Sequence, residues 1–317
     1  MAQGFSKQSR IFVAGHRGMI GSAFVRHFNS AGFDQLITRD HQALELTDKQ
    51  AVAAFFAEQR PDVVILAAGK VGGIVENQSY PADFITRNLE IQTNVIHSAH
   101  RFGVQRLLLF GSSCMYPREC PQPMAESALL TGKPEVTSMA YAMAKLAGVQ
   151  MCLAYNQQYG EQRFIPVIPN SVYGPNDNFD PRSGHVLSAL INRLHTAQRA
   201  GDALTTLWGS GTPRREFVYA DDLAAACHLL LATDLSTVEL PINIGCGYDL
   251  SIRELAQLIA SVIGYQGDIG WDTSKPDGTL RKLLDSSRIN ALGWRPATAL
   301  EAGIRHTYAS FLESSHA

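Results

Sequence analysis

The feature that most limits how this chain folds is a glycine-rich turn close to its N-terminus. Residues 11–14 are an apolar run, and three glycines follow it at intervals of three: Gly15, Gly18 and Gly21. Apolar residues then recur at helical spacing at Ile20, Phe24 and Phe28. A strand that turns into a helix in this way presents free backbone N–H groups to an anion at the helix N-terminus. The pattern predicts a strand–helix unit that binds the pyrophosphate of a dinucleotide.

The end of the next predicted strand, residues 35–38, bears on which dinucleotide is bound. An acidic residue there holds the ribose hydroxyls of NAD, whereas nearby arginine suits the 2′-phosphate of NADP. Arg39 follows the strand and Arg17 lies in the glycine-rich turn, so both guanidinium groups can reach such a phosphate. Asp40 leaves a solvated Arg–Asp pair as the alternative. We expect NADP.

Strand and helix patterns alternate with short links through the first half of the chain. Residues 62–68 are apolar without alternation, as in a parallel strand covered on both faces, and residues 81–102 are predicted to form a long helix. Residues 106–110 and 164–168 are further apolar runs. The alternation predicts an α/β fold with a doubly wound parallel (Rossmann) sheet, whose ligands lie beyond the carboxyl ends of the strands.

After residue 170 the predicted elements become shorter and irregular. Helices are expected near residues 185–198, 222–231, 251–263 and 300–312, and strands near residues 205–208, 216–219 and 241–244. We therefore predict an NADP-binding domain over residues 1–170, to which parts of 213–245 return. Residues 171–317 are mainly a smaller C-terminal α/β lobe that binds the substrate.

Composition excludes several classes of function. The formal net charge is −2, which does not suggest a nucleic-acid partner. No apolar run approaches the ~20 residues that span a bilayer, and the first ten residues lack a signal-peptide core. The five cysteines lack the spacing of a metal site or a disulfide framework. We expect a cytoplasmic protein without a metal centre.

A second motif supplies acid–base chemistry. Tyr141 and Lys145 stand four residues apart on a predicted helix that Thr137 or Ser138 would cap. A fixed ammonium beside a phenol favours the phenolate, so the pair is suited to exchange a proton with a carbonyl oxygen. Ser112, at the end of the 106–110 strand, would hold the same oxygen. An amphipathic helix surface is the simpler reading of Tyr-x-x-x-Lys alone.

Cys114 adds a base to this group. Residues two apart on an extended segment point to the same side, so Cys114 would share the active face with Ser112 while Ser113 turns away. A thiolate near Lys145, a cofactor's positive ring and a histidine would have a lowered pKa. His185, after a Pro/Gly-rich loop, is suited to donate a proton on the opposite side of a substrate carbon. The remaining cysteines are expected to be buried and inert: Cys120, Cys152, Cys227 and Cys246.

These motifs resemble those of the extended, sugar-nucleotide-modifying branch of the short-chain dehydrogenase/reductases, and most closely the GDP-L-fucose synthase family. The similarity runs from about residue 11 to residue 294. It is carried by residues 15–23, 71–74, 80–84, 111–117, 122–126, 173–179, 208–217 and 275–285.

The resemblance implies an NADPH-dependent bifunctional enzyme that converts GDP-4-keto-6-deoxy-D-mannose to GDP-L-fucose. Cys114 would be the base and His185 the acid for inversion at C3 and C5. Tyr141, assisted by Lys145 and Ser112, would protonate O4 during reduction. Contacts to the GDP-sugar would come from Ser113, Arg193, Trp208, Arg215, Asp277 and Lys282, because forked arginine donors suit a diphosphate.

The resemblance also implies the cofactor contacts and a homodimer. The cofactor would be bound by Gly15, Arg17, Gly18, Met19, Ile20, Gly21, Arg39, Asp48, Ala67, Ala68, Gly69, Tyr141, Lys145, Pro169, Asn170, Ser171 and Val172. Among these, Asp48 would contact the adenine edge. Two copies would pair through the Tyr141 helix and the 81–102 helix.

Two other functions stay open on the sequence alone. One is a 4-reductase, with or without C5 epimerisation, that acts on another GDP-4-keto sugar such as the colitose precursor or a 6-deoxyheptose. The other is a non-catalytic NADP-binding sensor, against which the intact Tyr141 and Lys145 argue.

Overall fold

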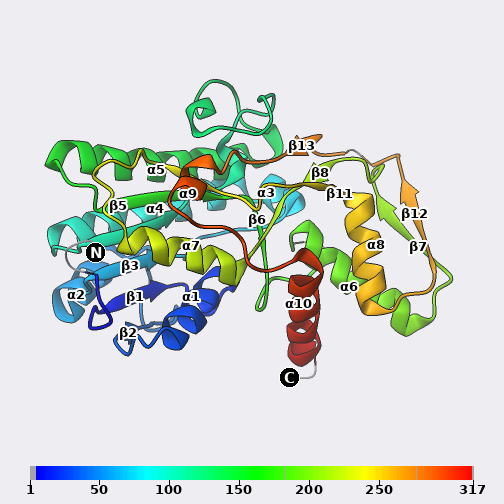
Figure 1. The fold of residues 1–317 in the computed structure, drawn as a ribbon, viewed down its shortest axis with the longest axis horizontal. Coiled ribbons are helices and arrows are strands. Elements are labelled where there is room, and N and C mark those ends of the chain that lie inside the picture. Colours follow the sequence, from blue (N-terminus) through cyan, green and yellow to red (C-terminus); the bar gives the residue numbers. More distant parts are fainter. Residues whose placement is uncertain (1–4, 182, 276, 316–317) are drawn as a thin grey trace.

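The structure is a computed structural model that describes residues 5–181, 183–275 and 277–315 (Figure 1). Its centre is a parallel six-stranded sheet with the strand order β10-β5-β4-β3-β1-β2. The strands are β1 (Ile11–Ala14), β2 (Leu36–Ile37), β3 (Val63–Leu66), β4 (Arg106–Phe110), β5 (Phe164–Pro169) and β10 (Ile242–Ile244). The chain runs outward from β1 to β2 and then crosses back to β3. The predicted doubly wound sheet is confirmed.

Helices cover both faces of this sheet (Figure 1). Alternate strand residues point to opposite faces, so Ile11 and Val13 pack on one side and Phe12 and Ala14 on the other. The first side carries α1 (Met19–Ser30) and α7 (Ala220–Ala232), and the second carries α2 (Lys49–Gln59), α4 (Pro81–Arg101) and α5 (Met139–Tyr159). Full burial of a side chain such as Phe12 stabilises the fold by about 1.5–3 kcal/mol.

In addition to the two apolar cores on the faces of the sheet, a third apolar core lies beside the sheet, on the right in Figure 1. It is formed largely by α6 (Val186–Ala200), α8 (Ile252–Ile263) and α10 (Leu300–Ser315), with β7 (Leu204–Trp208), which pairs with β12 (Asp268–Asp272). Two further sheets follow: β11 (Leu250–Ser251), β8 (Arg214–Arg215) and β13 (Arg281–Lys282); and β6 (Ser171–Tyr173) with β9 (Phe217–Tyr219). The division at residue 170 stays a prediction.

Several short elements have no counterpart in the predicted pattern. They are the helices α3 (Ile74–Ser79) and α9 (Ser287–Ala291) and the single turns η1 (Ser113–Met115), η2 (Glu126–Ala128) and η3 (Val136–Ser138). Each is too short to show a hydrophobic period. The turn η1 overturns one expectation directly, because the extended backbone expected to reach Cys114 ends at Ser112.

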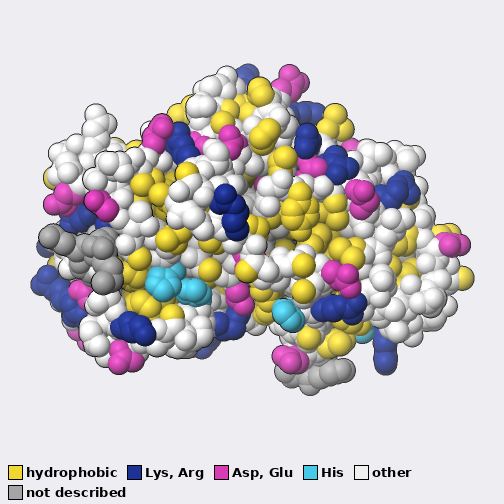
Figure 2. All heavy atoms as spheres, in the orientation of Figure 1, with side chains coloured by type: hydrophobic (Ala, Val, Ile, Leu, Met, Phe, Trp, Pro, Cys, Tyr) yellow, Lys and Arg dark blue, Asp and Glu magenta, His cyan; other side chains and the backbone are white. Residues whose placement is uncertain are grey.

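The surface agrees with the small net charge. Lys and Arg side chains lie interspersed with Asp and Glu over the face shown in Figure 2. Within residues 5–181, 183–275 and 277–315, no helix is long and apolar enough to cross a membrane.

Candidate active site

The glycine-rich turn joins β1 to α1 at the carboxyl edge of the sheet. Gly15 has φ +85°, a conformation that side chains rarely adopt, and a Cβ at Gly21 would collide with the Gly15 carbonyl oxygen. The first turn of α1 holds no acidic residue. Its open N–H groups and its helix dipole therefore fit an anionic pyrophosphate.

Three predicted cofactor residues already have protein partners. Arg17 pairs with Asp40 at 3.2 Å, with 76% and 33% of the two side chains exposed. The Arg39 guanidinium lies 5.7 Å from the centre of the Phe55 ring. The Asp48 carboxylate caps α2 by accepting hydrogen bonds from the backbone of residues 50 and 51 at 2.8 and 3.0 Å. An ion pair as exposed as Arg17–Asp40 is weak, so Arg17 remains available to a phosphate.

Ser112 and Cys114 come together at the end of β4, by a different route from the one predicted. The Ser112 hydroxyl caps η1 by accepting a hydrogen bond from the Cys114 backbone at 3.2 Å. This cap bends the chain, so the two-residue alternation of a strand does not apply. Ser113, expected to turn away, is buried. The Cys114 sulfur still lies within hydrogen-bonding reach of the side chains of Ser112 and Ser138.

Thr137 or Ser138 was predicted to cap the Tyr141 helix, and Ser138 is the one that occupies the N-cap position. It stands at the N-cap of α5, yet its hydroxyl makes no capping hydrogen bond. The hydroxyl bonds to Cys114 instead. Sequence spacing gives no sign of this contact, because the long segment between η1 and α5, which includes η2 and η3, separates the two residues.

Tyr141 and Lys145 lie one turn apart on α5, with the Lys145 ammonium 5.8 Å from the centre of the Tyr141 ring. The expected lowering of the phenol pKa is wrong. Burial raises the pKa of Tyr141, a negative charge on Cys114 raises it further, and a hydrogen bond to Ser112 opposes both. Burial also lowers the pKa of Lys145 to about 8. A buried neutral phenol is a proton donor, as reduction of a ketone requires.

Asn88 on α4 is a site residue that sequence reasoning missed. Its buried amide donates hydrogen bonds to the carbonyls of Lys70 and Phe84 at 2.9 and 2.7 Å. A Cβ at Gly69 would meet the Asn88 Oδ1 at 2.7 Å and the Lys145 Nζ at 3.6 Å. Gly69 therefore allows the backbone after β3 to lie between these two polar groups. An isolated Asn within a helical pattern carries no signal of this role.

The cation beside Cys114 is Lys282, not the predicted Lys145. The Lys282 Nζ lies 3.7 Å from the Cys114 Sγ. Burial alone would raise the pKa of the thiol, but the Lys282 charge and hydrogen bonds from Ser112, Ser138 and Lys282 outweigh it and lower the pKa. Arg215 is also within electrostatic reach of the sulfur.

The other predicted substrate contacts lie in the smaller lobe, where Asp277 is within electrostatic reach of Arg215. Trp208 is 62% exposed beneath the Lys275 ammonium. Asp277 accepts hydrogen bonds from the Ser210 backbone and hydroxyl at 2.9 and 2.7 Å, and Arg193 is exposed on α6. The residue Pro276, within the similar segment 275–285, lies outside the described residues.

His185 stands at the N-cap of α6 and is exposed. Its neighbouring charge is Asp177, a half-buried carboxylate that accepts a hydrogen bond from Ser188 at 2.8 Å. Among the described residues, no hydrogen bond or ion pair links His185 to Cys114. The preceding loop contacts the segment between β3 and α3, because the Ser183 carbonyl accepts a hydrogen bond from the Gly73 backbone at 2.8 Å.

The sequence matches known proteins over nearly its full length. Residues 11–245 match the NAD dependent epimerase/dehydratase family. Over 318 residues the chain is 51% identical to the GDP-L-fucose synthase of Escherichia coli strain K12, covering 98% of each chain. The chain belongs to the GDP-L-fucose synthase family. The resemblance in the sequence motifs is thereby confirmed.

Solved structures of related enzymes agree with this membership. A GDP-L-fucose synthetase from Naegleria fowleri bound to NADP has a TM-score of 0.88 and 28% identity, and the match covers 98% of this chain and 96% of that one. A GDP-6-OMe-4-keto-L-xylo-heptose reductase from C. jejuni has a TM-score of 0.92 and 35% identity, covering 98% and 99%. The family fold therefore serves more than one GDP-sugar.

Proposed function

We propose that this chain converts GDP-4-keto-6-deoxy-D-mannose to GDP-L-fucose, by inverting C3 and C5 and reducing C4 with NADPH. The observation that carries the proposal is the meeting of two proton-transfer groups at the end of β4. Cys114 has a lowered pKa and suits a base, whereas the buried Tyr141 phenol has a raised pKa and suits an acid. A plain reductase needs only the phenol.

NADPH binding is supported by the cradle at the carboxyl edge of the sheet. The turn of residues 15–21 would hold the pyrophosphate, and Arg17 and Arg39 would reach the 2′-phosphate. When bound, the cofactor supplies hydride to C4. Other contacts would come from residues 67–69 and from Pro169, Ser171 and Val172. The Asn170 side chain donates to Glu216 at 2.6 Å and to the Lys282 carbonyl at 3.2 Å, and its backbone N–H donates to the Ile244 carbonyl at 3.2 Å, so none of these donors is left for the cofactor.

The epimerase half-reaction assigns Cys114 and His185 to opposite sides of the sugar. The Cys114 sulfur takes a proton from a carbon beside the ketone, and the C–H electron pair moves into the enolate. His185 then returns a proton to that carbon from the other side. The hydrogen bond from Gly73 to the Ser183 carbonyl supports only a position of the loop before His185 next to the segment that follows β3.

The reductase half-reaction belongs to Tyr141, Ser112 and Lys145. The phenol gives its proton to O4 as that oxygen gains negative charge, and the Ser112 hydroxyl hydrogen-bonds the same oxygen. The Lys145 ammonium stabilises the phenolate that remains. Arg193, Trp208, Arg215 and Asp277 surround the GDP-sugar in this proposal.

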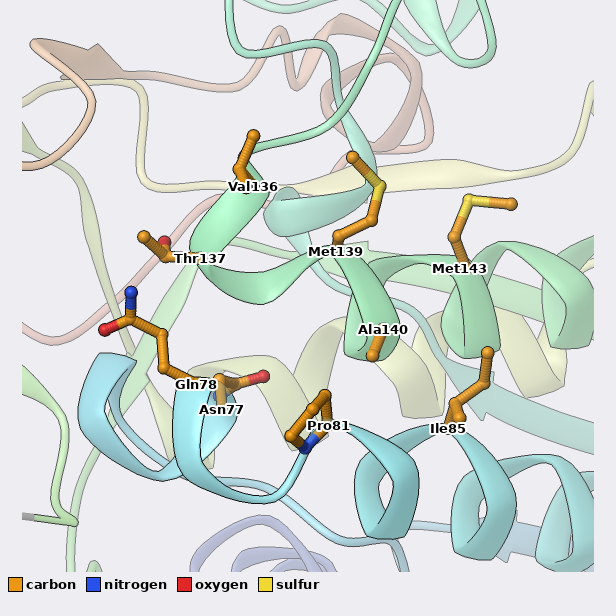
Figure 3. Close-up of a pocket in the computed structure, with 9 residues that line it drawn as sticks. All are labelled: Asn77, Gln78, Pro81, Ile85, Val136, Thr137, Met139, Ala140 and Met143. Carbon is orange, nitrogen blue, oxygen red and sulfur yellow. The ribbon is translucent and has the colours of Figure 1, made fainter.

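We also propose a homodimer through α4 and α5. Between the starts of these helices, Figure 3 shows a hollow lined by Asn77, Gln78, Pro81, Ile85, Val136, Thr137, Met139, Ala140 and Met143. None of the predicted catalytic residues lines it. Met143 is 45% and Val136 73% exposed, and a second copy of α4 and α5 would cover them. The cytoplasm is the proposed location, because the free Cys114 requires a reducing compartment.

The experiment that tests the proposal is incubation with NADPH in D2O with a panel of GDP-4-keto sugars. Product stereochemistry and deuterium content are read by NMR. NADPH oxidation with GDP-4-keto-6-deoxy-D-mannose and deuterium at both C3 and C5 are expected. Deuterium at neither carbon refutes the epimerase. Faster turnover of the colitose precursor or a 6-deoxyheptose would show that the protein is the alternative 4-reductase. Absence of NADPH oxidation with every sugar would favour the non-catalytic NADP-binding sensor.

A further inference from the structure

Lys282 and Cys114 meet in space although 168 residues separate them in the sequence. Lys282 lies on β13, in the segment expected to bind the GDP-sugar, and Cys114 lies on η1 after β4. The distance between Nζ and Sγ is 3.7 Å, and both side chains are half-buried. At this separation an opposite charge strongly favours the ionised form of the thiol.

The backbone that directly follows Lys282 is fixed by three hydrogen bonds. The Leu283 N–H donates to the Gln122 side chain at 2.9 Å, and the Leu283 carbonyl accepts from the Met124 backbone at 2.8 Å. The Leu284 N–H donates to the fully buried Glu216 carboxylate at 3.0 Å. Gln122 and Met124 belong to the same loop that follows Cys114, so β13 and the thiol are parts of one hydrogen-bonded unit.

Neighbouring side chains on β13 point in different directions. Arg281 donates to Asp249, which also accepts from Arg214. Lys282, next in the strand, points to Cys114, as the alternation of strand side chains requires. The two adjacent residues of β13 therefore have different partners. Arg281 forms an ion pair with Asp249, and Lys282 lies beside the Cys114 sulfur.

We propose that Lys282 is a positioning residue that holds the Cys114 sulfur as a thiolate for proton removal, in place of a contact to the GDP-sugar. This proposal rests on the proposed function in one respect, namely which substrate proton the sulfur removes. The state of the sulfur itself does not depend on the substrate. When the thiolate takes a proton it becomes a neutral thiol beside the ammonium, and loss of that proton to solvent restores the ion pair.

The other cysteines provide an internal comparison. The pKa of the thiol is raised by burial in Cys120, Cys152, Cys227 and Cys246. Cys114 alone among the described cysteines has a lowered pKa. Below the ordinary thiol pKa, alkylation at Cys114 should therefore be faster than at any of them, because only the thiolate reacts.

The test measures the pH dependence of iodoacetamide alkylation of the Cys114 peptide by mass spectrometry, in full-length protein without substrate. Lys282→Met should raise the midpoint of the Cys114 curve by about one pH unit or more, which slows alkylation about tenfold below both midpoints. Lys282→Arg should keep the low midpoint. Arg281→Gln is the matched control, since it removes a charge from the same strand and should leave the curve in place.

An unchanged Cys114 midpoint in Lys282→Met would overturn the proposal, most clearly if KM for the GDP-sugar rises while the alkylation curve stays fixed. If Lys282→Met unfolds, Lys282→Gln is measured in its place with the same criterion. A shifted midpoint without deuterium exchange on any GDP-4-keto sugar upholds the role of Lys282 and refutes the proposed epimerase. The two failures are therefore distinguishable.

Discussion

Cys114 and Tyr141 both hydrogen-bond to the Ser112 hydroxyl at the end of β4. After burial, the largest influence on the pKa of the Tyr141 phenol is the charge on Cys114, which raises it. An ionised sulfur therefore keeps the phenol protonated. The thiolate needed as a base and the neutral phenol needed as an acid are mutually compatible states of one site.

Replacement of the sulfur should separate the two half-reactions. We expect Cys114→Ser to slow solvent deuterium incorporation at C3 and C5 by about 10²–10⁴-fold, because a serine hydroxyl is not ionised at neutral pH. NADPH affinity should not change, and fluorescence titration of the cofactor checks this. Cys120→Ser is the control with a half-buried thiol of raised pKa. Full exchange in Cys114→Ser would exclude the sulfur as the base.

Removal of the Tyr141 hydroxyl should slow the reduction and leave the deuterium exchange in place. Tyr141→Phe is expected to slow NADPH oxidation by about 10²–10⁴-fold, since no group then protonates O4. Deuterium should still enter C3 and C5 of the recovered substrate. Stopped-flow absorbance and NMR follow the two rates. If both rates fell equally in both variants, the division of roles between Cys114 and Tyr141 would be wrong.

The buried Lys145 should make the free energy of unfolding depend on pH. Its pKa is lowered from its usual value of 10.5 to about 8 in the folded state. Between these values the unfolded chain binds the proton that the folded chain has lost, so the Lys145 contribution to the free energy of unfolding increases with pH. Below pH 8 the buried charge destabilises the fold by about 3 kcal/mol.

Lys145→Met tests this contribution. Without cofactor, the variant should exceed the wild type in the free energy of unfolding near pH 7, and the difference should shrink as the pH approaches 10. Urea unfolding at several pH values measures the difference. A difference that does not vary with pH would show that Lys145 is not desolvated in solution.

Arg17 should determine the preference for NADPH. We expect Arg17→Ala to weaken NADPH binding about 10–100-fold, the effect of losing one charged hydrogen bond to the 2′-phosphate. Binding of NADH, which lacks this phosphate, should change little and serves as the control. Equal weakening of both cofactors would assign Arg17 to the pyrophosphate instead.

The exposed face of α5 should control assembly. Met143→Arg places a charge where a second copy would pack, and we expect it to shift the protein from dimer to monomer in sedimentation velocity. Leu204→Arg is the control, because Leu204 is 59% exposed on β7 in the other lobe. A wild-type protein that sediments as a monomer at micromolar concentration would refute the dimer.

The sequence predicted the elements that depend on local order. The apolar runs of β1, β3 and β4 and the glycine turn after β1 follow from neighbouring residues, because burial on both faces and tight turning select residue types within a few positions. Tyr141 and Lys145 were predicted as a pair because the helical period alone brings them to one face.

The sequence by itself determined that a thiol, a phenol and a lysine would stand near a dinucleotide-binding edge. Only the tertiary structure decided which lysine acts on which group. It placed Lys282 on Cys114 and buried Lys145 beneath a phenol whose pKa rises. The physical reason is that ionisation depends on distance and desolvation, and both are set by segments that meet from opposite ends of the chain.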